Sequence, residues 1–153
     1  MPSFSLRRAA PSDVPAILPL MEAFNVHELI PWRPGPMGAA LREFLSDPAL
    51  GLGLVAERDD TATREIAGYG LANFGYDIEF AGRDSFVTEL FVAPAFRGHG
   101  LGRLLLEGLL VELRAAGIHA VHLMVRPENE RARALYEGFD FEVIPRLLMT
   151  KSL

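Results

Sequence analysis

The chain has 153 residues, the usual size of one domain with a single buried core, and half of them are hydrophobic. It contains no cysteine, so disulfides, zinc–thiolate sites and thiol nucleophiles are excluded. The formal net charge of −5 argues against nucleic acid as a partner, because binding to phosphates requires a basic face. The sequence therefore predicts one domain over residues 1–153 with no nucleic-acid partner.

Apolar runs in this sequence are short. No apolar core of a signal peptide follows the N-terminus, and charged residues interrupt every apolar run well below the length of a membrane span. The absence of cysteine also suits a reducing compartment. We therefore expect a soluble, cytoplasmic protein with no membrane partner.

The N-terminal part of the chain predicts a strand, a helix and a rigid linker. Residues 4–8 alternate apolar and polar side chains, as a half-buried strand does, and residues 13–29 carry apolar side chains at helical spacing. Pro19 lies deep enough in this helix to bend or interrupt it. Residues 30–36 contain three prolines and predict irregular structure that exposes Trp32, either as a wall of an acceptor site or as a cover over the core.

The middle of the chain predicts antiparallel strands. A short second helix ends before Pro48, and residues 52–57 and 66–74 follow as two strands. A polar turn joins these strands, which makes them antiparallel by default. Residues 85–92 form the next strand.

The C-terminal part of the chain predicts two further helices and three further strands. Residues 100–116 read as a helix, and the strand at residues 118–125 is parallel to its predecessor if the helix makes the usual right-handed crossover. Asn129 begins the last helix. Residues 141–144 and 147–150 predict a closing hairpin.

The turn that leads into the helix at residues 100–116 has glycines at alternate positions. It reads Arg97, Gly98, His99, Gly100, Leu101, Gly102 and Arg103, and we name residues 97–103 the glycine turn. Main-chain N–H groups of such a turn can close around an anionic group at the positive end of a helix. A Walker loop is excluded because the chain has no Gly-Lys pair. A dinucleotide fingerprint is excluded because Arg103 and Leu105 stand where its third glycine would be. A glycine-rich turn without a ligand is the alternative.

A second pattern lies downstream and reads Leu123-x-Val125-x-x-x-Asn129-x-x-Ala132-x-x-Leu135-Tyr136. From the residues alone, Asn129 is a helix N-cap and Tyr136 packs in the core. Together with the glycine turn and the apolar strand before it, this pattern resembles the GNAT superfamily of acyl-CoA N-acyltransferases over essentially the whole chain. One departure is Asp140, which stands where that family usually has a glycine, and aspartate tolerates the left-handed conformation better than most residues.

The resemblance implies a fold, a co-substrate and a set of binding residues. The implied fold is a single α/β domain with a central, mixed, mostly antiparallel sheet, a splayed pair of parallel strands and flanking helices. The implied co-substrate is acetyl-CoA, with no metal. Asn129 would hydrogen-bond the pantetheine arm, and Tyr136 would offer its hydroxyl to the thioester sulfur. The residues implied in acetyl-CoA binding are Leu90, Phe91, Val92, Arg97, Gly98, His99, Gly100, Leu101, Gly102, Arg103, Asn129 and Tyr136.

Transfer of an acetyl group to an amine needs a base, an acid and a polarised carbonyl. An alkyl ammonium group with a pKa of about 10 is not nucleophilic until it loses a proton, and Glu89 is the candidate base, acting through water. Tyr136 is the candidate acid for the departing thiolate. A backbone N–H near Val92 can polarise the carbonyl. Alternatively, Glu89 is a structural carboxylate paired with Arg83 or Arg97.

Acidic residues gather between positions 77 and 89, and they predict a cationic acceptor. The candidate acceptor contacts are Trp32, Asn73, Tyr76 and Glu79. The histidines predict no metal site, because His119 and His122 face opposite sides of a strand and the others, His27 and His99, lack neighbouring ligands.

The sequence thus predicts an acetyl-CoA-dependent N-acetyltransferase that acetylates the primary amine of a small molecule by direct transfer in a ternary complex, and a homodimer is compatible with it. One alternative is a non-catalytic regulatory module that binds acyl-CoA. The other alternative is acetylation of a protein or peptide amine. Met124 makes one such class less favoured, because acetyltransferases of ribosomal-protein N-termini often have a glutamate at this strand position.

Overall fold

The computed structural model describes residues 2–60 and 62–153. The described elements are β1 (Phe4–Arg8), α1 (Val14–Glu28), α2 (Pro34–Ser46), β2 (Gly51–Arg58), β3 (Glu65–Asp77), β4 (Gly82–Val92), α3 (Leu101–Ala115), β5 (Ala120–Leu123) and α4 (Glu130–Glu137), with 3-10 turns at Pro11–Asp13 and Pro94–Phe96. The strands form one sheet in the order β1-β2-β3-β4-β5. All neighbours are antiparallel except β4 and β5, which are parallel. The predicted mixed α/β fold is therefore confirmed.

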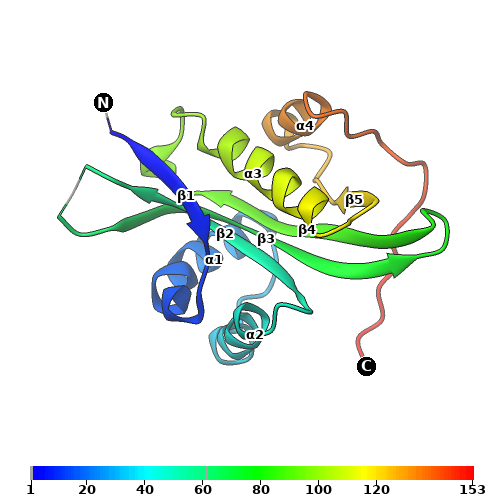
Figure 1. Cartoon of the computed structure of the whole chain (residues 1–153), viewed down its shortest axis with the longest axis horizontal. Helices are drawn as coiled ribbons and strands as arrows, with labels where there is room; N and C mark the ends of the chain where they lie inside the picture. Colours follow the sequence, from blue (N-terminus) through cyan, green and yellow to red (C-terminus); the bar gives the residue numbers. More distant parts are fainter. Residues whose placement is uncertain (1, 61) are drawn as a thin grey trace.

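The sheet separates two layers of helices, with α1 and α2 on one face and α3 and α4 on the other (Figure 1). Each face buries its own apolar cluster. Leu105 of α3 packs in one cluster with Leu54 of β2, and Ile17 of α1 packs in the other with Val55. Neighbouring residues of β2 belong to opposite clusters because successive side chains of a strand point to opposite faces. β2 is therefore buried on both faces, which explains its apolar run.

Two expectations about the prolines of the N-terminal part hold only in part. Pro19 was expected to bend or interrupt the first helix, and it does not interrupt α1, which continues to Glu28, because the buried side chains of Ile17 and Met21 hold the helix on the sheet on both sides of it. Residues 30–36 are not irregular throughout, since α2 begins at Pro34. A proline in the first turn of a helix lacks only an N–H that has no partner within the helix.

The predicted C-terminal hairpin is also wrong. Residues 141–144 and 147–150 lie in neither helix nor strand, and the chain leaves α4 as an extended segment that runs past the β3–β4 hairpin (Figure 1). Arg146 donates two hydrogen bonds to the Glu79 carboxylate, at 2.7 and 3.1 Å. The apolar pattern predicted strands, but a ladder also needs a partner edge, and Pro145 removes a donor from the middle of this segment.

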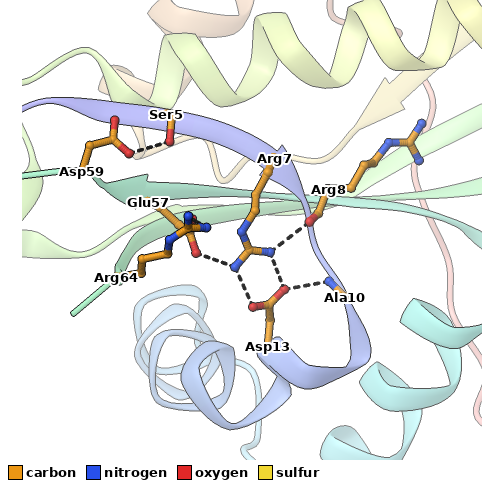
Figure 2. Close-up of polar contacts among 8 residues, drawn as sticks. All are labelled: Ser5, Arg7, Arg8, Ala10, Asp13, Glu57, Asp59 and Arg64. Carbon is orange, nitrogen blue, oxygen red and sulfur yellow. Dashed lines mark hydrogen bonds and ion pairs between the residues drawn. The ribbon is translucent and has the colours of Figure 1, made fainter. Parts of the chain in front are cut away.

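An ion-pair cluster fixes β1 to the start of α1 (Figure 2). The Arg7 guanidinium donates two hydrogen bonds of 2.7 Å to Asp13 and one of 2.5 Å to Glu57. Asp13 also accepts from the backbone N–H of Ala10 at 2.7 Å. These contacts hold the pKa of Asp13 and that of Glu57 below their usual range.

None of the described helices has the length and apolar character to cross a bilayer.

Candidate active site

The parallel strands β4 and β5 pair over only part of their lengths. Asp84 to Val87 lie opposite Ala120 to Leu123, and β5 ends there, although the sequence predicted a strand to residue 125. The remainder of β4, up to Val92, has no partner from β5. The strands are therefore splayed, as the resemblance implied, and a cavity of about 500 Å³ lies against the open edge of β4.

Several elements that are distant in sequence form the walls of this cavity. α1 and the segment that follows it contribute Phe24, His27, Glu28 and Ile30, and β4 contributes Val87, Thr88, Leu90, Phe91 and Val92. The opposite walls are Arg97, Gly98, Gly100, Leu101, Gly102, Arg103, Met124, Val125, Asn129, Arg131, Ala132, Leu135 and Tyr136. Every residue implied in acetyl-CoA binding lines the cavity except His99, which is exposed with Nδ1 at 3.2 Å from the Phe96 carbonyl.

The glycine turn has the geometry of an anion site. Gly98 and Gly100 have φ angles of 84° and 76°, in the left-handed region, and a Cβ built on either would have no heavy atom within 4 Å. The space in front of the turn is thus open to a ligand. Gly100 is also the N-cap residue of α3, and none of the described side chains caps the helix there. The first N–H groups of α3 therefore point toward the cavity end without a side-chain acceptor.

Arginines surround this turn. Arg97 donates from Nε to the Val92 carbonyl at 3.1 Å, and its guanidinium lies 5.6 Å from the centre of the Phe91 ring. Arg103 lies over Phe139, 4.7 Å from the ring centre. Arg131 lines the same cavity from α4. Main-chain donors, the positive end of a helix and three guanidinium groups together fit a diphosphate.

Asn129 and Tyr136 frame the cavity from the two ends of α4. The Asn129 side-chain oxygen accepts from the Ala132 N–H at 3.1 Å, so the predicted N-cap is confirmed, and the cap leaves the amide nitrogen unused. Burial, together with the charge of Glu28, raises the pKa of Tyr136 to about 12. The phenol is thus protonated at neutral pH. Asp140 has φ 64°, so it does adopt the left-handed conformation, and the Phe141 N–H closes the turn on the Tyr136 carbonyl at 3.1 Å.

Glu89 does not line the cavity that contains Tyr136. It lines a smaller one of about 190 Å³ on the α1–α2 side of the sheet, together with Met21, Met37, Ala40, Leu41, Phe44 and Leu71. The Tyr69 hydroxyl donates to Glu89 Oε2 at 2.5 Å. Burial raises the pKa of Glu89 to about 7, and the hydrogen bond from Tyr69 opposes this rise. A carboxyl with this pKa suits a general base at neutral pH.

The ion pair considered for Glu89 is not formed. Arg83 donates to the Ala116 carbonyl at 2.8 Å, and Arg97 donates to Val92. The actual partner, Tyr69, was missed because it comes from β3, and the register between β3 and β4 cannot be read from the sequence. Glu28 and Phe24 were missed for a similar reason, since only the packing of α1 against the sheet brings them to the cavity.

The predicted acceptor contacts lie elsewhere in the structure. Trp32 packs against the cluster beneath α1 and α2, in agreement with its reading as a cover over the core. Asn73 accepts a hydrogen bond from the Phe86 N–H at 3.0 Å. Tyr76 is 70% exposed, and Glu79 pairs with Arg146. These side chains line neither of the two cavities.

One histidine has neighbours that the sequence did not suggest. His122 Nε2 lies 3.2 Å from the Asp84 carboxylate, and Asp77 is close enough for the ligand atoms of all three to lie within 4.8 Å of one another. The sequence relates His122 to His119 alone and does not show these two carboxylates as its neighbours. The group is at the β3–β4 hairpin and the start of β5, and it contributes no residue to either cavity.

Comparisons with known proteins agree with this geometry. Residues 17–141 match the model of the acetyltransferase (GNAT) family. The chain is 31% identical to an acetyltransferase of Pectobacterium atrosepticum, over 92% of this chain and 89% of the relative. It is 28% identical to an L-methionine sulfoximine/L-methionine sulfone acetyltransferase of Pseudomonas aeruginosa, over 92% and 81%. The fold is similar to that of an aminoglycoside N-acetyltransferase in complex with CoA, with a TM-score of 0.78 and 17% identity over 99% of this chain and 96% of that one.

Proposed function

Since this chain belongs to the acetyltransferase (GNAT) family, we propose that it transfers the acetyl group of acetyl-CoA to the primary amine of a small molecule, directly and within a ternary complex. The observation that carries the proposal is the cavity in which the glycine turn, the open edge of β4 and Tyr136 meet. One relative, named for acetylation of L-methionine sulfoximine and L-methionine sulfone, supports the choice of a small acceptor.

The cavity walls divide the binding of acetyl-CoA between main chain and side chains. The N–H groups at the start of α3, with Arg97, Arg103 and Arg131, hold the diphosphate. The open edge of β4 from Leu90 to Val92 and the Asn129 amide hold the pantetheine arm. When bound, acetyl-CoA supplies an acyl group that is activated as a thioester. The Val92 N–H polarises its carbonyl as negative charge develops on the oxygen.

Two side chains donate and accept the protons of the reaction. Tyr136 is protonated at neutral pH, and its hydroxyl donates to the sulfur as the C–S bond breaks. Glu89, with a pKa of about 7, is the base for the ammonium proton. It reaches the amine through water, because it lines the smaller cavity and not the one that contains Tyr136. Correct placement of the two reactants against β4 supplies the rest of the rate enhancement.

Calorimetry and thiol release test this function. CoA should bind the purified protein, and free thiol should appear when acetyl-CoA is mixed with a panel of polyamines, aminoglycosides, amino acids, arylalkylamines and peptides. Release with a small amine supports the proposal. Binding without release across the panel would instead favour a non-catalytic acyl-CoA module. Release with peptides alone would favour a protein acceptor, and the absence of CoA binding would overturn the proposal altogether.

A further inference from the structure

The last turn of α1 faces the same cavity as Tyr136. Phe24, His27 and Glu28 all line it, and their spacing of three and four residues places them on one face of the helix. Within residues 2–60 and 62–153, Glu28 is the one acidic side chain that lines this cavity. Its side chain is only 20% exposed.

The surroundings of Glu28 favour a cation. Glu28 is the last residue of α1, where the helix dipole places partial negative charge. Leu29 follows with φ 58° and ends the helix in the left-handed conformation. The Ile30 N–H donates to the Asn25 carbonyl at 2.8 Å, and this hydrogen bond fixes the end of α1 beside the cavity.

The arginines that line the cavity come from other elements than Glu28 does. Arg97, Arg103 and Arg131 gather around the glycine turn and the start of α4. His27 Nδ1 lies 3.0 Å from Glu28 Oε1. Arg126 donates to the His27 carbonyl at 3.1 Å and lies 3.7 Å from the Glu128 carboxylate, but it does not line the cavity. Among the described residues, α1 and Ile30 thus offer the cavity a carboxylate and no arginine.

An aromatic wall adjoins Glu28. Phe24 lies one helical turn before it, and the Phe24 ring meets the Phe91 ring edge to face, with the ring centres 6.2 Å apart. Ile30 continues the apolar lining after the helix ends. An amine bound at Glu28 can therefore place the rest of its molecule against these apolar side chains.

We propose that Glu28 binds the ammonium group of the acceptor and that Phe24 and Phe91 contact its apolar body. The acceptor is then a primary amine with an apolar or aromatic substituent and no carboxylate next to the nitrogen. An α-carboxylate would lie beside Glu28, and like charges at that distance repel each other. This inference rests on the proposed function and adds a substrate class and a recognition residue to it.

The test measures binding without turnover. CoA, which has no acetyl group to transfer, is added to saturation, and 2-phenylethylamine or phenylalanine is then titrated by calorimetry. We expect 2-phenylethylamine to bind at least about tenfold more tightly than phenylalanine, and Glu28→Gln to weaken its binding at least about tenfold, because removal of one partner of a desolvated charge pair has effects of this size. Glu22→Gln is the matched control, since Glu22 is an exposed residue of the same helix outside both cavities.

Each outcome has a definite meaning. If CoA fails to bind, the proposed function itself fails. If CoA binds and Glu28→Gln holds 2-phenylethylamine as tightly as Glu22→Gln does, the role of Glu28 is overturned while the proposed function stands. If phenylalanine binds as tightly as 2-phenylethylamine, the substrate class is overturned. In turnover assays, Glu28→Gln should raise KM for the amine and leave KM for acetyl-CoA within about twofold.

A ligand-free measurement guards against misfolding of the variant. The chain has only three tyrosines, so the ultraviolet titration of Tyr136 is obtained as the difference between each protein and the same protein carrying Tyr136→Phe. The charge of Glu28 contributes to the raised pKa of Tyr136. Glu28→Gln should therefore lower this pKa from about 12. An unchanged pKa in a folded variant would show that Glu28 does not face Tyr136, and it would overturn the inference.

Discussion

The Tyr69 hydroxyl and the Glu89 carboxylate form a hydrogen bond of 2.5 Å between the neighbouring strands β3 and β4. Burial raises the pKa of Glu89 to about 7, and this bond opposes the rise. Burial, followed by the charge of Glu89 and by this bond, raises the pKa of Tyr69, so the phenol remains the donor throughout the neutral range. Tyr69 thus helps to set the pH at which Glu89 becomes a base.

Tyr69→Phe should move the pH dependence of the reaction. Without the hydrogen bond, the pKa of Glu89 rises above about 7. The rising limb of kcat/KM against pH, which follows deprotonation of the base, should shift to higher pH. Tyr76→Phe is the control, because Tyr76 is exposed and lines neither cavity. A profile that stays in place in Tyr69→Phe would assign the rising limb to a group other than Glu89.

Glu89→Gln should change how stability depends on pH. The folded pKa of about 7 lies above the unfolded value of about 4.3, so the folded protein binds more protons between these two pH values. The wild-type protein therefore loses stability as the pH rises through this window, and the variant lacks this loss. The check is the difference in unfolding free energy between the two proteins, measured by urea titration at pH 5 and pH 8. A constant difference contradicts the raised pKa.

Tyr136→Phe should reduce kcat by about a hundredfold, which is a typical effect for loss of a general acid. The dissociation constant of CoA should change little, because the variant removes one hydroxyl and keeps the ring against Phe141. Thiol-release assays measure kcat, and calorimetry measures the dissociation constant of CoA. Wild-type turnover in this variant would remove the assigned role of Tyr136, whereas a large loss of CoA affinity would make it a binding residue instead.

Gly100→Ala should weaken CoA binding by about tenfold or more, because a Cβ would occupy part of the open space in which we propose that the diphosphate is held. Gly117→Ala is a matched control. Gly117 also has φ 76° and no heavy atom within 4 Å of a built Cβ, but it lies at the other end of α3. Both variants should lose about 1 kcal/mol of stability from left-handed strain. Equal CoA affinity in the two would argue against an anion site at the glycine turn.

Arg7→Met should destabilise the protein by about 3 kcal/mol at pH 7, because it leaves the buried Asp13 without its guanidinium partner and leaves the buried Glu57 with only the longer pair to Arg64, at 3.6 Å. The lowered pKa values of these carboxylates mean that their contribution is present above the unfolded values of about 4 and is lost as the pH falls through the folded ones. The cost of the variant should therefore shrink in urea titrations below about pH 4. Arg58→Met, which breaks the exposed pair with Asp60, should have little effect at either pH.

The local segments of this site could be predicted from the sequence. The end of β4, the glycine turn and the start of α3 are continuous in the chain, and left-handed glycines and a helix N-terminus are properties of a continuous segment. The N-cap at Asn129 was predicted on the same basis and is confirmed. The hairpin predicted at the C-terminus failed because strand pairing depends on a partner edge and is not a property of the segment alone.

The sequence by itself determined the family, the order of the elements as far as α4 and the position of the glycine turn, since each depends on spacing along the chain. Only the tertiary structure decided which carboxylate faces which cavity. Glu89 pairs with Tyr69 and lines the smaller cavity, whereas Glu28 lines the larger cavity together with Tyr136 because α1 packs against the sheet. Strand register and helix docking are set by the burial of side chains from every layer at once, and so the chemistry of these two glutamates could not be assigned before the fold was known.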